Sequence, residues 1–336
     1  MRPVANPALV RRPSGRLAGL AAALAAALLA PLAAAQQQDF SAVQITTTPV
    51  AGTVSMLQGQ GGNIGVSAGE DGLLIIDTQF EPLAEKIRAA LDKLGTGGPR
   101  FVINTHWHGD HTGGNAVLGK QASIVAQDNV RTRLMNPVEV LGRKPDPAPA
   151  AALPRITFAD SVTLHWNGED VAVIHFPHGH TDGDSVVAFT RSKVIHLGDQ
   201  FFTGRFPFID TGSGGDVQGY TRNIAALLAA IPADWKIIPG HGPLAGRAEL
   251  QAFHDMLVKT TGIVRERLAS GQTPEQIAAA GLPEEWAEWG SGFIKTDRWL
   301  TLLAQGLQAS PDGPDPAASE AAGKELAAAI AASGAR

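Results

Sequence analysis

Apolar and polar positions in the first third of the chain follow the spacing of strands and one helix. Alternation predicts short strands at Val54–Leu57 and Ile64–Val66. Two continuous apolar runs, Leu73–Ile76 and Phe101–Ile103, are typical of strands buried on both faces. Between these runs, apolar residues at helical spacing predict a helix over Pro82–Leu94 that stops at a glycine. This part of the chain therefore combines strands with a covering helix.

The second part of the chain repeats this plan. Further strands are predicted near Ile124–Val125, Ile156–Phe158, Val162–Leu164, Val171–His175, Ser185–Phe189 and Val194–Leu197, and helices at Val217–Ala230, Ala248–Ala269, Thr273–Ala280 and Phe293–Leu307. The Pro- and Ala-rich stretch Asn136–Pro154 is predicted to be an irregular surface loop. Strands followed by helices, twice over, favour an α/β fold built as a four-layer αββα sandwich over a doubly wound parallel sheet. The pattern alone leaves both open.

The two ends of the chain differ from this middle part. Residues 1–35 carry four arginines, an uncharged Ala/Leu segment and then Ala33–Ala35, which predicts a secretory signal peptide and a periplasmic or secreted protein. The alternative is an uncleaved membrane anchor, although the apolar segment is short of the about 20 residues that span a bilayer. Twin-arginine export is a further possibility. Residues 36–308 are predicted to form the folded domain, and the Pro/Ala-rich tail 309–336 a linker with a marginal or disordered helix.

Composition narrows the chemistry. Hydrophobic residues make up 44% and charged residues 18%, which supports a packed core. The sequence has no cysteine, so a metal site must use histidine and carboxylate ligands. Without residues 1–35 the chain keeps 23 basic and 32 acidic residues, a net charge of -9. This balance disfavours nucleic acid as a partner.

One histidine-rich segment follows directly after a predicted buried strand. His106, His108 and Asp110 alternate in an extended chain, so their side chains can face one point. His111 follows at once and needs a turn to join them, which the neighbouring glycines allow. Four nitrogen or oxygen ligands within six residues suit zinc.

Three later residues stand at the ends of other predicted strands. His180 lies in the loop after Val171–His175, Asp199 ends the strand that begins at Val194, and His241 follows Ile237-Ile238. Loops cluster at the ends of strands beside a rigid sheet, so each of the three is a candidate ligand of the same site.

The His-x-His-x-Asp-His motif and these later ligands resemble the metallo-β-lactamase superfamily, from about Val43 to Leu307. The resemblance implies two zinc ions. The first would be bound by His106, His108 and His180, the second by Asp110, His111 and His241, and Asp199 would bridge them. The ions would share a water and lower its pKa, and the hydroxide, oriented by Asp110 as a catalytic residue, would attack a carbonyl. Asp77, which ends a strand, is either a hydrogen-bond partner of a ligand histidine or a strand-end cap.

The superfamily contains several activities, and the sequence departs from two of them. Similar lactonases have tyrosine three residues after the bridging aspartate, where this chain has Phe202. Many similar β-lactamases have cysteine at the position of Asp199 and a lysine three residues later, and this chain has neither. An exported, β-lactamase-like zinc hydrolase is the favoured hypothesis. A lactonase or esterase, and a periplasmic redox-relay protein of the same fold, remain alternatives.

Other residues are predicted to shape a pocket for a small lactam, lactone or ester. The turn Gln58–Asn63 is predicted to form a mobile flap, and Phe201, Phe202, Phe206 and Phe208 to supply aromatic walls, with at least two of them in the core. Arg205 is interpreted as solvated, with substrate binding as the alternative. The remaining histidines are interpreted as structural, solvated or pocket residues: His165, His175, His178, His196 and His254.

Overall fold

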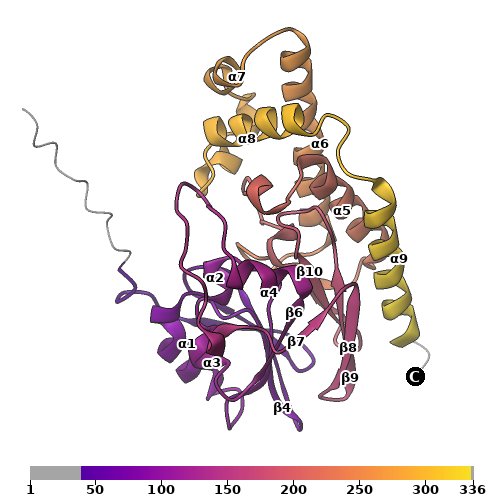
Figure 1. The fold of residues 1–336 in the computed structure, drawn as a ribbon. Helices are drawn as coiled ribbons and strands as arrows, with labels where there is room; N and C mark the ends of the chain where they lie inside the picture. Colours follow the sequence, from indigo (N-terminus) through magenta and orange to yellow (C-terminus); the bar gives the residue numbers. More distant parts are fainter. Residues whose placement is uncertain (1–38, 334–336) are drawn as a thin grey trace, which may run out of the picture. The chain divides into compact units, whose positions relative to one another are not determined.

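Two β-sheets packed face to face organise the chain in the computed structural model, which describes residues 39–333 (Figure 1). The first sheet contains, in chain order, β1 (Thr46–Ala51), β2 (Val54–Gln58), β3 (Ile64–Gly69), β4 (Gly72–Ile76), β5 (Pro99–Ile103), β6 (Ser123–Gln127) and β7 (Ile156–Phe158). The second sheet has the order β12 (Lys236–Ile238), β11 (Val194–His196), β10 (Ser185–Phe189), β9 (Glu169–His175) and β8 (Ser161–Trp166). The predicted strands are thus present, most of them within two residues of the predicted bounds.

Helices cover the outer faces of both sheets, and others lie at the ends of the strands or pack on other helices. They are α1 (Ala84–Leu91), α2 (Gly109–Thr112), α3 (Asn115–Leu118), α4 (Asp128–Met135), α5 (Val217–Ala230), α6 (Arg247–Ala269), α7 (Pro274–Ala280), α8 (Thr296–Ala309) and α9 (Pro316–Ser333). Helix α7, for example, packs on α6 and α8. In Figure 1, α1 and α3 lie on one side of the sandwich, and α5 and α9 on the other. The predicted αββα sandwich is confirmed.

The alternation of side chains along single strands explains the four layers. In β4, Leu73 and Ile75 pack against α1, whereas Leu74 and Ile76 point into the space between the sheets. In β9, Val171 and Val173 fill that same space, and the alternate residues pack against the helices on the far side. Both strands are apolar on both faces, which is why they appear in the sequence as continuous hydrophobic runs.

Strand direction brings several strand ends to one edge of the sandwich. β4, β5 and β6 are parallel to one another, as are β11 and β12. β9 and β11 both pair antiparallel with β10, so they also run in one direction. The segments that follow β4, β5, β9, β11 and β12 carry the residues of the candidate site.

The prediction for the C-terminal tail is wrong in one respect. The Ala-rich segment forms α9, which packs against α5 and β9 rather than remaining marginal. Ala322 and Leu326 are buried in the same core cluster as α5, and the Ser161 hydroxyl hydrogen bonds to Glu325. An Ala-rich helix of low intrinsic amphipathicity is stabilised here by tertiary packing.

The sequence analysis did not predict one of the helices. This helix is α4, in which only Val130 and Leu134 are buried, so the apolar periodicity is weak.

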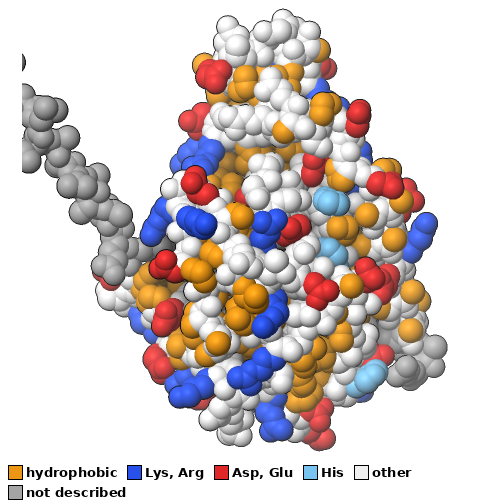
Figure 2. Space-filling model, viewed as in Figure 1, with side chains coloured by type: hydrophobic (Ala, Val, Ile, Leu, Met, Phe, Trp, Pro, Cys, Tyr) orange, Lys and Arg blue, Asp and Glu red, His pale blue; other side chains and the backbone are white. Residues whose placement is uncertain are grey.

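The predicted signal peptide, residues 1–35, lies outside the described residues. Among the described helices, none has the length and apolar character needed to cross a membrane. Figure 2 shows acidic and basic side chains interspersed over the face in view.

Candidate metal centre

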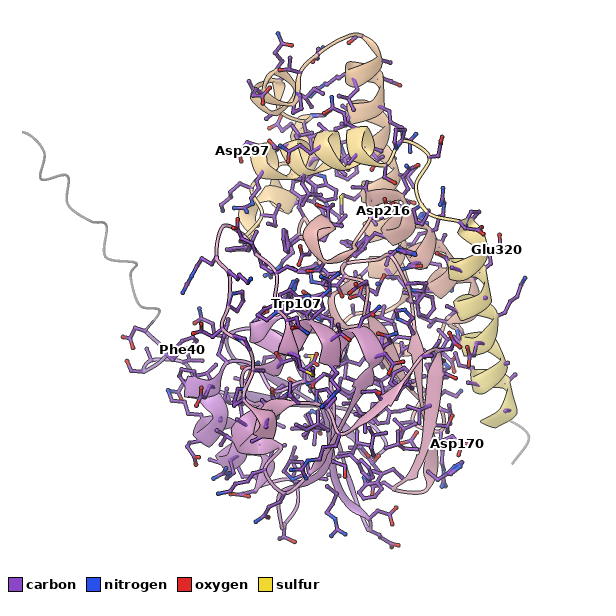
Figure 3. All side chains as sticks on the ribbon, in the orientation of Figure 1. Phe40, Trp107, Asp170, Asp216, Asp297 and Glu320 are labelled. Atoms are coloured by element: carbon purple, nitrogen blue, oxygen red, sulfur yellow. The ribbon has the colours of Figure 1, made fainter. Side chains whose placement is uncertain are left out.

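All seven candidate ligands meet at the edge of the sandwich where these strands end. The segment after β5 turns into α2, so that His106, His108, Asp110 and His111 come from one short stretch of chain. In Figure 3, Trp107, between two of these histidines, lies mid-molecule, while Asp170 of β9 marks the opposite end of the sandwich. The candidate ligands and Asp170 therefore lie at different ends of the sandwich.

The first group of ligand atoms comes from His106, His108 and His180. Their ring nitrogens lie within 4.8 Å of one another, and all three residues are buried. Nε2 of His180 lies 2.8 Å from Nδ1 of His108. Three buried imidazoles facing one point form a natural site for a borderline-soft divalent ion.

The second group comes from Asp110, His111 and His241. Nε2 of His241 lies 3.3 Å from Oδ2 of Asp110 and 3.3 Å from Nε2 of His111. This group is more open than the first, because the side chains of Asp110 and His241 are 28% and 19% exposed. Solvent and substrate therefore reach the cluster from this side.

Asp199 stands between the two groups. Its Oδ2 faces the first group, 3.4 Å from Nε2 of His180 and 3.8 Å from Nε2 of His106. Its Oδ1 faces the second group, 3.1 Å from Nε2 of His111 and 3.4 Å from Nε2 of His241. One carboxylate oxygen toward each group is the arrangement of a bridging ligand.

The ring nitrogens that face away from the cluster determine which tautomers are present. In four of the five histidines the outer nitrogen donates to an oxygen, so in the neutral ring the inner nitrogen directs its lone pair toward the cluster. These bonds run from Nδ1 of His106 to Thr105 Oγ1 (3.0 Å), from Nε2 of His108 to Asp210 Oδ2 (2.9 Å), from Nδ1 of His111 to Asp77 Oδ2 (2.7 Å) and from Nδ1 of His180 to the Phe208 carbonyl (2.7 Å).

Two buried polar atoms at the centre of the cluster bear on whether its residues fit metal ions. Nε2 of His106 and Oδ1 of Asp199 have no hydrogen bond of good geometry within the part of the chain that the structure describes. Buried polar atoms are rarely left unpaired. The lone pairs, the carboxylates and these unpaired atoms together fit a pair of bound metal ions.

Asp77 both caps the end of a strand and bonds to a candidate ligand histidine, which are the two roles that the sequence left open. It follows β4 with a φ of 65°, and its Oδ1 accepts the Thr105 backbone N–H at 2.8 Å, so it caps the strand end. Its Oδ2 also accepts hydrogen bonds from the Thr105 hydroxyl and from Nδ1 of His111, both at 2.7 Å. A fully buried carboxylate thus orients a candidate ligand from behind.

Asp210 is a functional residue that the sequence analysis missed. Its carboxylate accepts from Nε2 of His108 and, at 2.6 Å, from the Ser213 hydroxyl. Its backbone N–H donates to the His180 carbonyl at 2.9 Å, which ties its loop to a second ligand. The loop has no apolar period and no motif, so no signal in the sequence placed this aspartate beside the cluster.

Charge coupling among the side chains of the cluster is strong. Burial alone raises the pKa of Asp199, but the surrounding histidines, His111 foremost, hold it well below its ordinary value. Burial also opposes protonation of His241, yet the carboxylates of Asp199 and Asp110 raise its pKa to about 9. The same carboxylates hold the pKa of His111 well above its ordinary value against burial. Carboxylates that stabilise protonated imidazoles stabilise metal cations in the same way.

In the first group, the pKa values of two histidines are lowered rather than raised. Burial lowers the pKa of His180 to about 4 and holds that of His106 well below its ordinary value. Both imidazoles are therefore neutral at neutral pH. Neutral imidazole is the form that binds metal, so these two side chains present lone pairs without first losing a proton.

Comparison with known proteins gives the family. A family model described as "Metallo-beta-lactamase superfamily" matches residues 57–241, a span that includes all seven candidate ligands. The chain belongs to the metallo-beta-lactamase superfamily. The resemblance stated from the motif is confirmed.

Relatives within the superfamily differ in activity. A "Hydroxyacylglutathione hydrolase" of Halorhodospira halophila is 28% identical over 200 residues, covering 58% of this chain and 68% of that protein. A "Metallo-beta-lactamase type 2" of Bacteroides fragilis is 24% identical over 200 residues, covering 60% and 72%.

Solved structures share the fold. A metallo-beta-lactamase from Pontibacter korlensis has a TM-score of 0.53 and 20% identity, covering 64% of this chain and 99% of that one. A sec-alkylsulfatase from Pseudomonas has a TM-score of 0.59 and 17% identity, covering 81% and 52%.

Two of the four phenylalanines predicted to wall the site lie beside the candidate ligand histidines. The Phe202 ring stacks on His241, with centroids 5.0 Å apart and an interplanar angle of 15°. The Phe208 ring lies 6.0 Å from His108 and 5.9 Å from His180. Phe201 and Phe206 are instead buried in the core between sheet and helices, which confirms that only part of this aromatic set faces the site.

The turn Gln58–Asn63, predicted to form a mobile flap over the site, lies against the cluster. Gly62 N–H donates to the Asp110 carbonyl at 3.0 Å, and the Gln79 side chain donates to the Gly62 carbonyl at 2.7 Å. A Cβ on Gly62 would come within 2.1 Å of the His111 ring, so the turn lies directly on a ligand. The turn therefore forms a wall of the site next to a candidate ligand, and its mobility stays a prediction.

The remaining histidines lie outside both groups. His196 is buried and donates through Nε2 to the Asn63 carbonyl, and His175 bonds through Nδ1 to the Asp184 carbonyl. His165 pairs with Asp170 at the opposite end of the sandwich, and His178 is exposed. Asp184 accepts from Thr181 and Gln200, in keeping with a loop cap.

Proposed function

We propose that this protein is an exported dinuclear zinc hydrolase that cleaves the acyl bond of a small substrate, with a β-lactam as its substrate class. One observation carries the proposal: Asp199 directs one carboxylate oxygen to each of two three-ligand groups. Such an arrangement accommodates two ions a few ångströms apart, and the nitrogen and oxygen donors suit zinc.

Bound zinc would supply Lewis acidity and lower the pKa of a water held at the site. The chain supplies the rest. His106, His108 and His180 are held rigid by buried partners, which suits them to a permanent first ion. Asp110 is the most exposed carboxylate of the cluster, so we assign it the task of orienting the attacking water and accepting its proton. Water adds to the carbonyl carbon, the acyl bond breaks, and the leaving group takes up the proton.

The walls support a small, partly apolar acyl substrate. Phe202 and Phe208 flank the second and first groups, and the Gly61–Gly62 turn closes the third side. Backbone approaches closely at this turn because glycine has no side chain to exclude it. A compact lactam or lactone ring fits such surroundings better than a long polymeric substrate.

The test is hydrolysis of a chromogenic cephalosporin by residues 36–336, loaded with zinc, with and without chelator. We expect chelator-sensitive turnover on the order of 1 per second or more. His106→Ala should abolish it, whereas His165→Ala, which removes an exposed histidine at the opposite end of the sandwich, should not. Absence of turnover in protein shown to hold two zinc ions overturns the β-lactam assignment.

A thioester is the second candidate, because several of the curated relatives carry the name hydroxyacylglutathione hydrolase. The same preparation should therefore be assayed with a hydroxyacyl thioester of glutathione, a lactone and a simple ester. Turnover of one of these without cephalosporin hydrolysis keeps the hydrolase and changes its substrate. Two bound zinc ions without turnover of any of them favour the redox-relay hypothesis.

A further inference from the structure

His241 differs from the other four candidate histidine ligands in how it is held. Each of the others donates through its outer ring nitrogen to a fixed oxygen. Within the described residues, Nδ1 of His241 makes no such bond, and its contacts run through Nε2 toward the cluster. It also has the most exposed side chain of the five, at 19%. Phe202 stacks on its ring, but without a bond at the outer nitrogen within the described residues its position also depends on the loop that carries it.

The loop that carries His241 is rich in glycine, and backbone bonds tie it to the segment after β11: the Gly240 N–H donates to the Gly198 carbonyl at 2.8 Å, and the Thr203 N–H donates to the His241 carbonyl at 3.0 Å. Its sequence is Pro239-Gly240-His241-Gly242, and Gly242 has a φ of 105°. A Cβ on Gly240 would come within 2.0 Å of Oδ1 of Asp199. The loop therefore needs glycine to approach the cluster, and glycine leaves the backbone with little conformational restraint of its own.

Asn63 supplies a further restraint from the opposite sheet, where Gln58 Nε2 also donates to the Gly242 carbonyl at 3.2 Å. Its side-chain Nδ2 donates to the carbonyls of Pro239 and Gly242, both at 2.9 Å, which lie on either side of His241. Its backbone N–H donates to the Gly240 carbonyl at 2.7 Å. Two carbonyl oxygens against one side-chain atom require that atom to be the amide nitrogen, so the orientation of the carboxamide is fixed.

A buried histidine holds Asn63 in turn. Nε2 of His196 donates to the Asn63 carbonyl at 3.0 Å, and Nδ1 of His196 accepts the Gly198 N–H at 3.0 Å. Gly198 immediately precedes Asp199. Asn63 is 4% exposed and His196 is fully buried, so water does not compete for these bonds. The chain of contacts joins the turn at Asn63 to the segments that carry His241 and Asp199.

We propose that Asn63 is a positioning residue for the second metal site, acting by clamping the two carbonyls that flank His241. The inference rests on the proposed function, because it requires two metal ions. It assigns the Asn63 side chain to the second ion alone: its carboxamide bonds to no residue of the first group.

The test compares zinc binding to Asn63→Ala and Asn167→Ala. Asn167 is a matched control at the other end of the sandwich, where its side chain also makes several bonds, donating to Ser67 and Gly72 and accepting from Asp71. Zinc stoichiometry is counted by elemental analysis after dialysis, and the affinity of each ion by competition with a chromophoric chelator. Asn63→Ala should weaken the second ion about 10- to 100-fold and leave the first unchanged.

The controls separate a positioning role from a structural one. Asn167→Ala should lower the melting temperature but retain both ions at wild-type affinity, and His241→Ala should give the one-ion form directly. Asn63→Ser, which keeps the backbone bonds and one donor, should lie between Asn63→Ala and wild type and serves if the alanine variant fails to fold. Wild-type affinity for both ions in Asn63→Ala and Asn63→Ser, or equal weakening of both ions, overturns the inference. Wild-type protein that binds fewer than two ions overturns the proposed function instead.

Discussion

Replacing Asp210 removes the carboxylate that, among the described residues, bonds to His108, and the expected effect follows from this contact. The bond from Nε2 of His108 to Oδ2 is 2.9 Å long, and the side chains are only 10% and 5% exposed. A hydrogen bond to a charged group contributes about 1.5–3 kcal/mol. At 1.4 kcal/mol per tenfold change, its loss should weaken binding of the first ion by about 10- to 100-fold.

The substitution to alanine also frees the His108 ring to adopt its other tautomer. Nδ1 faces the cluster only while Nε2 carries the proton, and Asp210 is the acceptor that keeps it there. Asp210→Asn should have a smaller effect than Asp210→Ala, because an amide oxygen still accepts this bond without the charge. The Ser213 hydroxyl, which also donates to Asp210, is retained in both variants.

The assay is competition for zinc between the protein and a chromophoric chelator, with melting temperature recorded in parallel. Asp182→Asn is the matched control, since Asp182 lies in the adjoining loop and pairs with Arg133 at 2.6 Å rather than with an imidazole. We expect this control to bind both ions as wild type does. If Asp210→Ala also binds both ions with wild-type affinity, the argument that Asp210 fixes a ligand tautomer is refuted.

Three further predictions concern other parts of the chain. Leu326→Ala in α9 empties a fully buried core position and should destabilise the fold by about 2–5 kcal/mol, measured by denaturant unfolding; a change within error would show that α9 does not pack as described. In metal-free protein, the pKa of His241 is raised to about 9, above the about 6.5 of an unfolded histidine, so its stabilisation is complete below about pH 6.5 and is lost as pH rises through 9. The melting temperature of chelated wild type should therefore fall more over this range than that of His241→Ala, and equal falls would contradict the assignment. Expression of the full chain with export should give a mature N-terminus at Gln36 by mass spectrometry, whereas an intact Met1 in the membrane fraction would support the anchor alternative.

The sequence predicts the ligands because each stands at a recognisable place. His106, Asp199 and His241 all follow continuous apolar strands, and side chains beyond such strands converge wherever the strands run in one direction. The same logic gives the sandwich, since β4 and β9 are apolar on both faces.

Such patterns do not predict the contacts that hold the candidate ligands in place. Asp210 and Asn63 lie in irregular segments, and their partners are 102 and about 180 positions away in the chain. Position in a loop gives no period, so only the folded backbone shows that these side chains meet the ligand segments. The contacts of the turn predicted as a flap are equally hidden from the sequence, because they come from residues outside the turn such as Gln79 and Gly240.

The most direct test of the two-ion site is a count of zinc on the intact cluster. Native mass spectrometry of residues 36–336, titrated with zinc from the metal-free state, should show two ions bound at saturation. Asp199→Ala should lose tight binding of the pair, because no other described residue directs an oxygen to both groups. Saturation at one ion or none in wild type would contradict the account.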